Sequence, residues 1–175
     1  MEGLRKTFET TRLKLRPLAF GDEKVIFIHI SDDLTKHWIG WEKSETVEIE
    51  QQKTGKKLMQ MKSGQEIHFL AFDKGTNEFI GICGIEPDMI SQEDKEINVW
   101  VKKESQNKGY ATEMIKGLLD QVRKNTNLSY LIYSVTKGNM GSQAIADKLE
   151  LSAFRTFEAM KRDQKREVTD YKIFL

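Results

Sequence analysis

The segment from residue 96 to residue 122 constrains the fold of this chain more than any other. It opens with Glu-Ile-Asn-Val-Trp-Val, an alternating run rich in β-forming residues, which predicts a strand. Apolar residues at helical spacing then predict an amphipathic helix: Ala111, Met114, Ile115, Leu118, Leu119 and Val122. Gly109 lies at the junction. A helix start offers unpaired N–H groups and a positive dipole end, so the junction suits a phosphate group beside the end of a strand.

The residues at this junction fit a known motif. Gln106-Asn107-Lys108-Gly109-Tyr110-Ala111 resembles the Q/R-x-x-G-x-G/A loop with which the GNAT acetyltransferases bind the pyrophosphate of acetyl-CoA. Three further blocks resemble the RimJ/RimL-like subgroup of that family and follow its order: Thr11 to Leu18, Glu96 to Trp100, and the set Val135, Asn139, Ser142 and Ala146 to Leu149. Together the four blocks cover nearly the whole chain.

The resemblance implies an α/β (α+β) fold. It predicts a single GNAT-type N-acetyltransferase domain over residues 10–175, after a loose N-terminal end at residues 1–9. The central sheet is expected to be mixed, with about six or seven strands and flanking helices. Its central parallel pair is expected to be splayed to admit coenzyme A. A helix separates the Glu96 strand from the β-rich run Tyr130 to Val135, which independently predicts that these two strands are parallel.

The remaining elements follow from alternation, turn residues and caps. The other predicted strands are Thr10–Leu18, Ile67–Phe72, Glu78–Glu86, Phe154–Met160 and Glu167–Leu175. Asp22 is expected to cap a first helix, Ser44 a second, and Asn139 or Gly138 to begin the last. Gly55 argues against one unbroken second helix, which Ser63-Gly64 should end. The charged run Lys161 to Arg166 is expected to be a solvated turn.

The composition excludes several classes of protein. A chain of 175 residues is long enough for one sizeable core. Its net charge of +1 provides no general attraction to nucleic acid or to an anionic membrane, and neither is an expected partner. The single cysteine, Cys83, excludes an internal disulfide framework and is expected to be buried. The sequence has no signal peptide and no bilayer-spanning run, so a cytoplasmic location is predicted.

The resemblance implies a set of residues that bind acetyl-CoA as co-substrate. Backbone groups of Val99, Trp100 and Val101 would pair with the pantetheine arm like an added strand. Amides from Asn107 to Thr112 would hold the pyrophosphate, with Lys108 adding a charge. The complete predicted set is Val99, Trp100, Val101, Gln106, Asn107, Lys108, Gly109, Tyr110, Ala111, Thr112 and Asn139.

Two residues are candidates for catalysis. Glu96 is the leading general base, since a carboxylate near apolar groups has a raised pKa, although it would equally serve to bind a cationic substrate. Ser142 matches the family position that protonates the leaving thiolate. Asn139 as a helix cap, with Ser142 in the first turn, is the structural alternative. Tyr133 is a weaker alternative donor. Asn98 departs from the subgroup's usual glycine at that position.

The acceptor site is less well defined by the sequence. His37, Trp38 and Trp41 lie in an unusual aromatic segment, which would form a wall of the acceptor pocket or pack a connector against the core. The histidines and Cys83 show no metal-ligand spacing, so no metal is predicted.

Two functions compete. The first is an acetyl-CoA-dependent N-acetyltransferase that moves an acetyl group to a primary amine by direct attack in a ternary complex. The acceptor would be a protein N-terminus or a small-molecule amine. The alternative is a non-catalytic acyl-CoA-binding or sensing module, suggested by departures from the subgroup pattern at Asn98 and Val99. The sequence is compatible with a homodimer and does not establish one.

Overall fold

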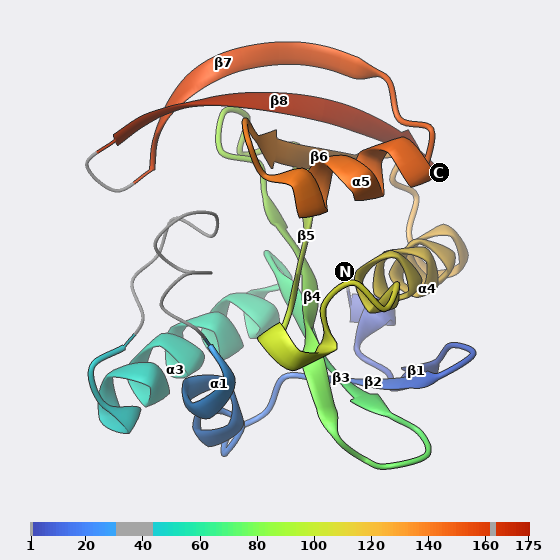
Figure 1. The fold of residues 1–175 in the computed structure, drawn as a ribbon. Coiled ribbons are helices and arrows are strands. Elements are labelled where there is room, and N and C mark those ends of the chain that lie inside the picture. The colour runs from blue at the N-terminus through green and yellow to red at the C-terminus, as the bar shows by residue number, and fades with distance from the viewer. Residues whose placement is uncertain (1, 31–43, 162–163) are drawn as a thin grey trace.

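The computed structural model describes residues 2–30, 44–161 and 164–175. One eight-stranded sheet has the order β1-β2-β3-β4-β5-β6-β8-β7. The strands are β1 (Phe8–Glu9), β2 (Leu13–Pro17), β3 (Ile67–Asp73), β4 (Phe79–Pro87), β5 (Lys95–Val101), β6 (Tyr130–Thr136), β7 (Ala153–Lys161) and β8 (Gln164–Phe174). The other described elements are the helices α1 (Glu23–His29), α3 (Val47–Ser63), α4 (Tyr110–Asn125) and α5 (Met140–Lys148), with 3-10 turns η1 (Glu2–Leu4) and η3 (Lys103–Ser105) (Figure 1).

The sheet is mixed, which confirms the predicted fold class. Neighbouring strands pair antiparallel, except that β5 and β6 run parallel, joined through α4. The sheet exceeds the predicted six or seven strands because the short edge strand β1 adds an eighth: Phe8 pairs with Leu15, and Glu9 with Lys14.

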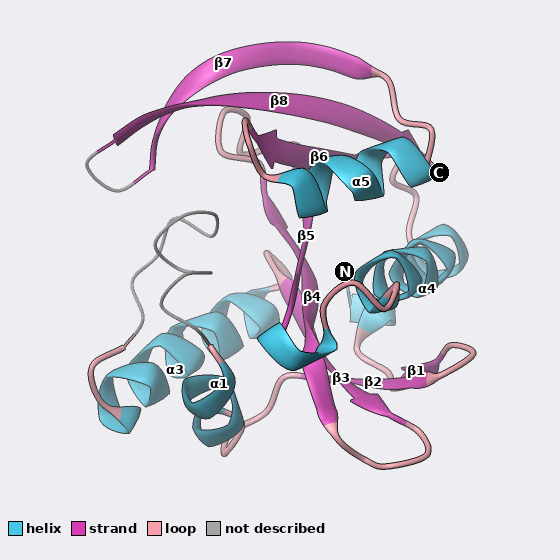
Figure 2. Ribbon diagram, viewed as in Figure 1, coloured by secondary structure: helices cyan, strands magenta, loops and turns pink. Residues whose placement is uncertain are grey.

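The central parallel pair separates almost as soon as it forms. The ladder between β5 and β6 holds one register pair, Glu96 with Ile132. On its other edge, β5 pairs with β4 from Lys95 to Val101. Figure 2 shows β6, β7 and β8 as one group of strands and β1 to β4 as another, with β5 passing between them. The prediction of a splayed central pair is therefore confirmed.

The helices lie on both sides of this divided sheet. Helices α1 and α3 pack against each other, and α4 packs against β4 and β5 on the other side of the sheet (Figure 1). The face of α4 that meets the sheet carries Met114, Ile115, Leu118, Leu119 and Val122, all buried as the helical spacing predicts.

Local sequence signals fix the ends of α3. Thr46, rather than the predicted Ser44, is the N-cap, and its hydroxyl accepts from the Ile49 amide at 3.4 Å. Gly64 ends the helix in the left-handed conformation, with φ of 80°. The helix continues unbroken through Gly55, because the cost of one glycine, about 1 kcal/mol, is small beside the packing of a long helix.

The N-terminal segment and the closing hairpin contain more regular structure than the sequence predicts. Residues 1–9 were expected to form a loose end, yet Leu4 and Phe8 are buried in the core. Burial of these two apolar side chains stabilises the segment, and so short a segment shows too little alternation to predict that burial. Toward the C-terminal end, the predicted closing hairpin is present and its strands extend farther than predicted: Met160 pairs with Lys165 and Lys161 with Gln164, while residues 162–163 in the middle of the predicted turn lie outside the described residues.

Two glycines in β4 allow close contacts, as their position inside a strand predicts. A Cβ at Gly81 would lie 2.2 Å from the Trp100 carbonyl oxygen, and one at Gly84 would lie 2.5 Å from Nδ1 of His68. Either side chain would push β4 away from its neighbours. Within the described residues, no helix combines the length and apolar character needed to cross a membrane.

Candidate active site

The loop between β5 and α4 has the backbone of an anion-binding turn. Asn107 and Gly109 both adopt positive φ, at 60° and 79°. Gly109 is the N-cap of α4 and has no side chain to cover the amides of the first turn. Those amides have no acceptor within the helix, and successive amides in a turn of this kind converge on an anion. The backbone from 107 to 112 therefore suits a diphosphate.

Side chains of the loop hold it in place. The side-chain Nε2 of Gln106 donates to the Val101 carbonyl at 3.0 Å and so holds the loop against the end of β5. Lys108 does not extend toward the predicted ligand, because its ammonium group donates to the Glu104 carbonyl at 2.9 Å. Lys108 is thus the one described member of the predicted cofactor-binding set that does not line the cavity beside this loop.

A cavity of about 740 Å³ joins the loop to the divided sheet. It is lined by every other predicted cofactor residue that the structure describes, and by both candidate catalytic residues: Glu96, Val99, Trp100, Val101, Gln106, Asn107, Gly109, Tyr110, Ala111, Thr112, Asn139 and Ser142. The predicted acceptor residues His37, Trp38 and Trp41 lie outside the described residues. The cavity is large enough for a cofactor arm and a substrate group.

The open edge of β5 forms one side of this cavity. Beyond the pair of Glu96 with Ile132, no ladder joins β5 to β6, and residues 97–101 face the cavity. Backbone groups on an unpaired strand edge can accept an extended ligand as an added strand. The pantetheine arm of coenzyme A carries amides suited to such pairing.

The start of α5 faces the same cavity. Asn139 is its N-cap, and its side-chain oxygen accepts from the Ser142 amide at 3.1 Å. The capping role considered from the sequence is therefore present, and it leaves the Ser142 hydroxyl to serve elsewhere. Tyr133 on β6 donates to the Ser142 carbonyl at 3.4 Å. Burial, opposed in part by this contact and assisted by the charge of Glu96, raises the pKa of Tyr133 to about 12.

Three carboxylates line the same cavity. Glu86 and Glu96 are register partners on β4 and β5, and both line the cavity. Like charges directly opposite on neighbouring strands repel, so this pair favours a cation nearby. Glu50 on α3 is a third lining carboxylate; it is buried and accepts from the Ser44 hydroxyl at 2.5 Å. The arrangement suits a positively charged ligand.

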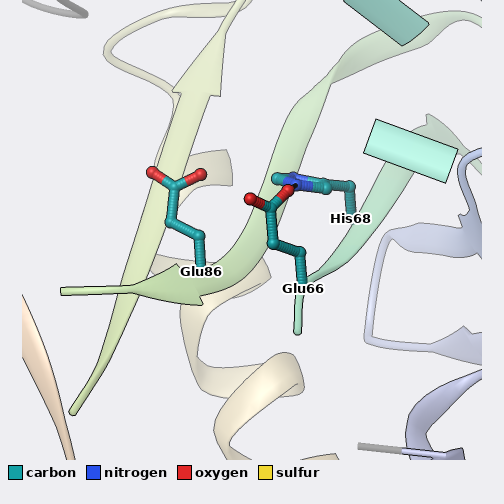
Figure 3. A group of neighbouring side chains, drawn as sticks. All are labelled: Glu66, His68 and Glu86. Carbon is teal, nitrogen blue, oxygen red and sulfur yellow. Dashed lines mark hydrogen bonds and ion pairs between the residues drawn. The ribbon is translucent and has the colours of Figure 1, made fainter. Parts of the chain in front are cut away.

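Lys57 supplies a built-in cation at this place. Its Nζ atom lies 3.4 Å from Nε2 of His68 and 4.0 Å from Oε2 of Glu86. Figure 3 shows the side chains of Glu66, His68 and Glu86 beside one another, with the Glu66 carboxylate against the His68 ring. One ligand-type atom from each residue lies within 4.8 Å of the other two. Because an ammonium group already lies among these atoms, the group is an ion-pair cluster here, and the expected lack of a metal stays a prediction.

His68 and Glu66 form a buried pair within this cluster. His68 Nε2 lies 2.8 Å from Oε2 of Glu66. Burial lowers the pKa of His68 and outweighs the hydrogen bond to Glu66. For Glu66, burial opposes ionisation, but the His68 contact and nearby cations prevail and lower its pKa. At neutral pH a neutral His68 therefore donates from Nε2 to an ionised Glu66.

The structure adds residues that the sequence did not single out. Glu50, Thr54 and Lys57 on α3 line the cavity, although polar residues at that spacing are typical of a solvated helix face. The burial of Glu50 and Thr54 is the sign of their role, and only the structure provides it. Cys83 is buried, as predicted, and burial raises the pKa of its thiol, so it is no nucleophile.

Comparison with known proteins decides the family. The acetyltransferase (GNAT) domain matches residues 12–152 of this chain. The chain belongs to the GNAT acetyltransferases. This GNAT protein is 24% identical, over 166 residues, to the uncharacterized protein YkkB of Bacillus subtilis, a match that covers 84% of this chain and 86% of YkkB.

Solved structures share the whole fold of this GNAT protein. RimL, a ribosomal α-N-protein acetyltransferase solved with coenzyme A, matches with a TM-score of 0.84 at 13% identity, over 97% of this chain and 98% of RimL. An acetyltransferase from Salmonella typhimurium that modifies the N-terminal serine of a 50S ribosomal subunit protein matches at 0.81 and 14%, over 95% and 96%. A GNAT acetyltransferase from Bacillus anthracis matches at 0.80 and 19%, over 96% and 98%. These matches agree with the RimJ/RimL-like resemblance seen in the sequence.

Proposed function

We propose that this GNAT protein transfers the acetyl group of acetyl-CoA to a primary amine by direct attack in a ternary complex, with a protein N-terminus as the leading acceptor class. One observation carries the proposal: a single cavity is lined both by the loop around Gly109 and by the carboxylates Glu86 and Glu96. The loop fits a diphosphate, and the carboxylates fit an ammonium group. A donor and an acceptor bound there would meet beside β5.

In this mechanism Glu96 receives the proton of the acceptor ammonium. Loss of that proton frees the nitrogen lone pair, which attacks the thioester carbonyl carbon; the C–S bond then breaks and its electron pair goes to sulfur. The nitrogen loses a second proton as it becomes an amide, and that proton replaces the one that the Ser142 hydroxyl gives to sulfur. Glu96 lies where β5 and β6 part, at the point where the arm and the amine would approach each other. Its location supports the role of base.

Protonation of the leaving thiolate falls to residues of β6 and α5. Tyr133 and Ser142 both line it, and the raised pKa of Tyr133 keeps the phenol protonated throughout the neutral range. We propose that the Ser142 hydroxyl gives its proton to the sulfur. Tyr133 would either hold Ser142 in place through its contact with the Ser142 carbonyl or act as the proton donor itself.

Two further observations support a protein N-terminus as the acceptor. The structural neighbours include an enzyme that modifies a protein N-terminal serine. An α-amine is a cation at neutral pH, which the lining carboxylates would attract.

A cytoplasmic, reducing location is part of the proposal, supported by the single, buried Cys83.

Thiol release from acetyl-CoA tests the function. Peptides with free N-termini should release coenzyme A, and the same peptides with blocked N-termini should not. Turnover with small amines alone would refute the proposed acceptor class, whereas binding of acetyl-CoA without turnover across the whole panel would favour a sensing module.

Glu96→Gln then separates the two roles of that carboxylate. If Glu96 is the general base, the variant should have a kcat about a hundredfold lower, within the usual range for general-base catalysis. A rise confined to the acceptor KM would assign Glu96 to binding instead.

A further inference from the structure

Two arginines at the opening strand are each joined to the start of a different helix. Arg12 directly precedes β2, and Arg16 lies within it. Leu13 and Leu15 between them are fully buried, so the strand is fixed in the core. Lys14 is exposed on the other face of the strand from these leucines, which is also the face of Arg16.

Arg12 contacts both sides of Gly109. On the helix side, its Nε atom lies 2.7 Å from Oε2 of Glu113 and its backbone amide donates to Oε1, also at 2.7 Å. On the loop side, Nη1 donates to the Lys108 carbonyl at 3.1 Å. The guanidinium carbon lies 4.2 Å from the centre of the Tyr110 ring. One side chain thus bonds the residue before Gly109 and the first turn after it.

Glu113 is fully engaged in this contact. It also accepts from the Thr10 hydroxyl at 2.6 Å. Partial burial opposes its ionisation, but the hydrogen bonds from Thr10 and Arg12 prevail, so the pKa of Glu113 lies below its ordinary value. The carboxylate also lies in the first turn of α4, where a negative charge is favourable.

Arg12 lies behind the loop rather than in the cavity. It is not among the residues that line the cavity. Its Nη2 atom is 3.7 Å from the position that a Cβ of Gly109 would occupy. A guanidinium in that place holds the loop without occupying the ligand's space.

Arg16 makes a comparable contact on the acceptor side. Its two terminal nitrogens lie 2.6 Å and 2.8 Å from the oxygens of Asp22, the residue before α1. Asp22 also accepts from the Ala19 amide at 2.8 Å, which explains why its side chain makes no capping bond to α1. Ile26 of α1 lines the cavity. Arg16 therefore fixes the helix that carries this part of the wall.

We infer that Arg12 and Arg16 are positioning residues with separate tasks: Arg12 presents the phosphate loop to the donor, and Arg16 fixes the wall that meets the acceptor. This inference rests on the proposed acetyl-CoA function. A planar guanidinium suits both places because it bonds two acceptors in fixed directions, which an ammonium cannot do.

Binding of coenzyme A to the intact protein, measured by calorimetry, tests the task of Arg12. Arg12→Gln should weaken binding about tenfold, as expected for the loss of charged hydrogen bonds. Arg12→Lys should remain weak, since it keeps the charge and loses the two-directional contact. Arg16→Gln and the exposed control Lys14→Gln should keep the wild-type affinity. If Arg12→Lys restores affinity fully, or if Arg16→Gln weakens binding as much as Arg12→Gln, the inference is overturned.

Further measurements separate positioning from folding and from the proposed function. Hydrogen exchange of the Glu113 amide, which donates to the Gly109 carbonyl at 3.1 Å, and of the next amides of α4 should accelerate in Arg12→Gln and in the second variant Glu113→Gln, while β8 amides stay unchanged; uniform acceleration would indicate general destabilisation and refute the inference. In turnover, Arg12→Gln should raise the acetyl-CoA KM, and Arg16→Gln the acceptor KM. If the wild type does not bind coenzyme A, the proposed function fails, and the exchange experiment still decides whether Arg12 anchors the loop.

Discussion

Arg155 on β7 is paired with Asp88, the residue that follows β4: its Nη2 atom lies 2.9 Å and 2.7 Å from the two carboxylate oxygens. Its Nε atom lies 2.5 Å from Asp170 on β8. A second link joins Tyr130 on β6 to Asp94 at 2.6 Å. These contacts tie the two halves of the sheet together at the end where β5 begins. They leave the other end open for the cofactor.

Removal of the Arg155 charge should destabilise the protein strongly. The carboxylates of Asp88 and Asp170 are 1% and 0% exposed, so Arg155→Met would leave two buried negative charges unpaired. Loss of one partner of a buried pair costs roughly 3–5 kcal/mol, and we expect the lower end because Arg155 is 24% exposed. Urea denaturation measures the change. The control is Arg123→Met. The Arg123 side chain is 45% exposed and pairs with exposed Asp120, so its loss should change the free energy of unfolding by less than about 0.5 kcal/mol.

Gly109→Val should weaken the binding of coenzyme A with little change in overall fold. The glycine has φ of 79°, a conformation that strains a β-branched residue, so the turn would shift and its amides would no longer converge. We expect affinity to fall by at least tenfold, measured by calorimetry. Gly55→Val is the matched control, since a Cβ there meets nothing within 4 Å. Equal affinity of both variants would remove the phosphate-loop assignment.

Local patterns predicted which residues would gather around the loop at Gly109, and their binding of coenzyme A stays a prediction. Gly109 at the helix start, Asn139 as a cap and the alternation of β5 are all signals spread over a few residues. The chemistry of a phosphate loop depends mainly on its own backbone, so a short motif suffices to find it. Lys108 is the exception, because the direction of a long side chain depends on neighbours that a motif does not specify.

The acceptor half could not be predicted in the same way. Glu86 meets Glu96 only through the register of β4 with β5. Likewise, Lys57 reaches His68 because α3 packs over β3. Each of these residues alone resembles an ordinary surface or core residue, and long-range packing alone brings them together.

Substitutions at Tyr133 and Ser142 should separate the two candidate proton donors. Ser142→Ala should lower kcat by at least tenfold while coenzyme A affinity stays nearly unchanged, because the Asn139 cap bonds the amide of residue 142 and not its hydroxyl. Tyr133→Phe should have a smaller effect if Tyr133 only supports Ser142. Steady-state kinetics with matched calorimetry measure both. A larger loss in Tyr133→Phe than in Ser142→Ala would reverse the assignment.

The pH dependence of stability should report the His68–Glu66 pair. Burial lowers the pKa of His68 from 6.5. As pH falls below about 6.5 the unfolded chain therefore takes up a proton before the folded protein does, and stability decreases until the pH passes the folded pKa. The pKa of Glu66 is lowered from 4.5, so its contribution is lost only in a more acidic range. Part of the stability lost between pH 6.5 and 4.5 should thus come from proton uptake by His68 in the unfolded chain.

His68→Gln removes this group while keeping a donor for Glu66. The free energy of unfolding, measured by urea denaturation from pH 7.5 to 5.0, should fall less steeply in the variant than in the wild type. One proton taken up on unfolding corresponds to a slope of about 1.4 kcal/mol per pH unit, which is the largest difference to expect. Identical slopes would mean that folding leaves the pKa of His68 unchanged. A wild type that gains stability relative to the variant as the pH falls from 7.5 would mean that His68 is already protonated in the folded protein. In that case Glu66, Glu86 and Lys57 would surround an imidazolium, and the charge balance of the acceptor side would be less negative by one unit.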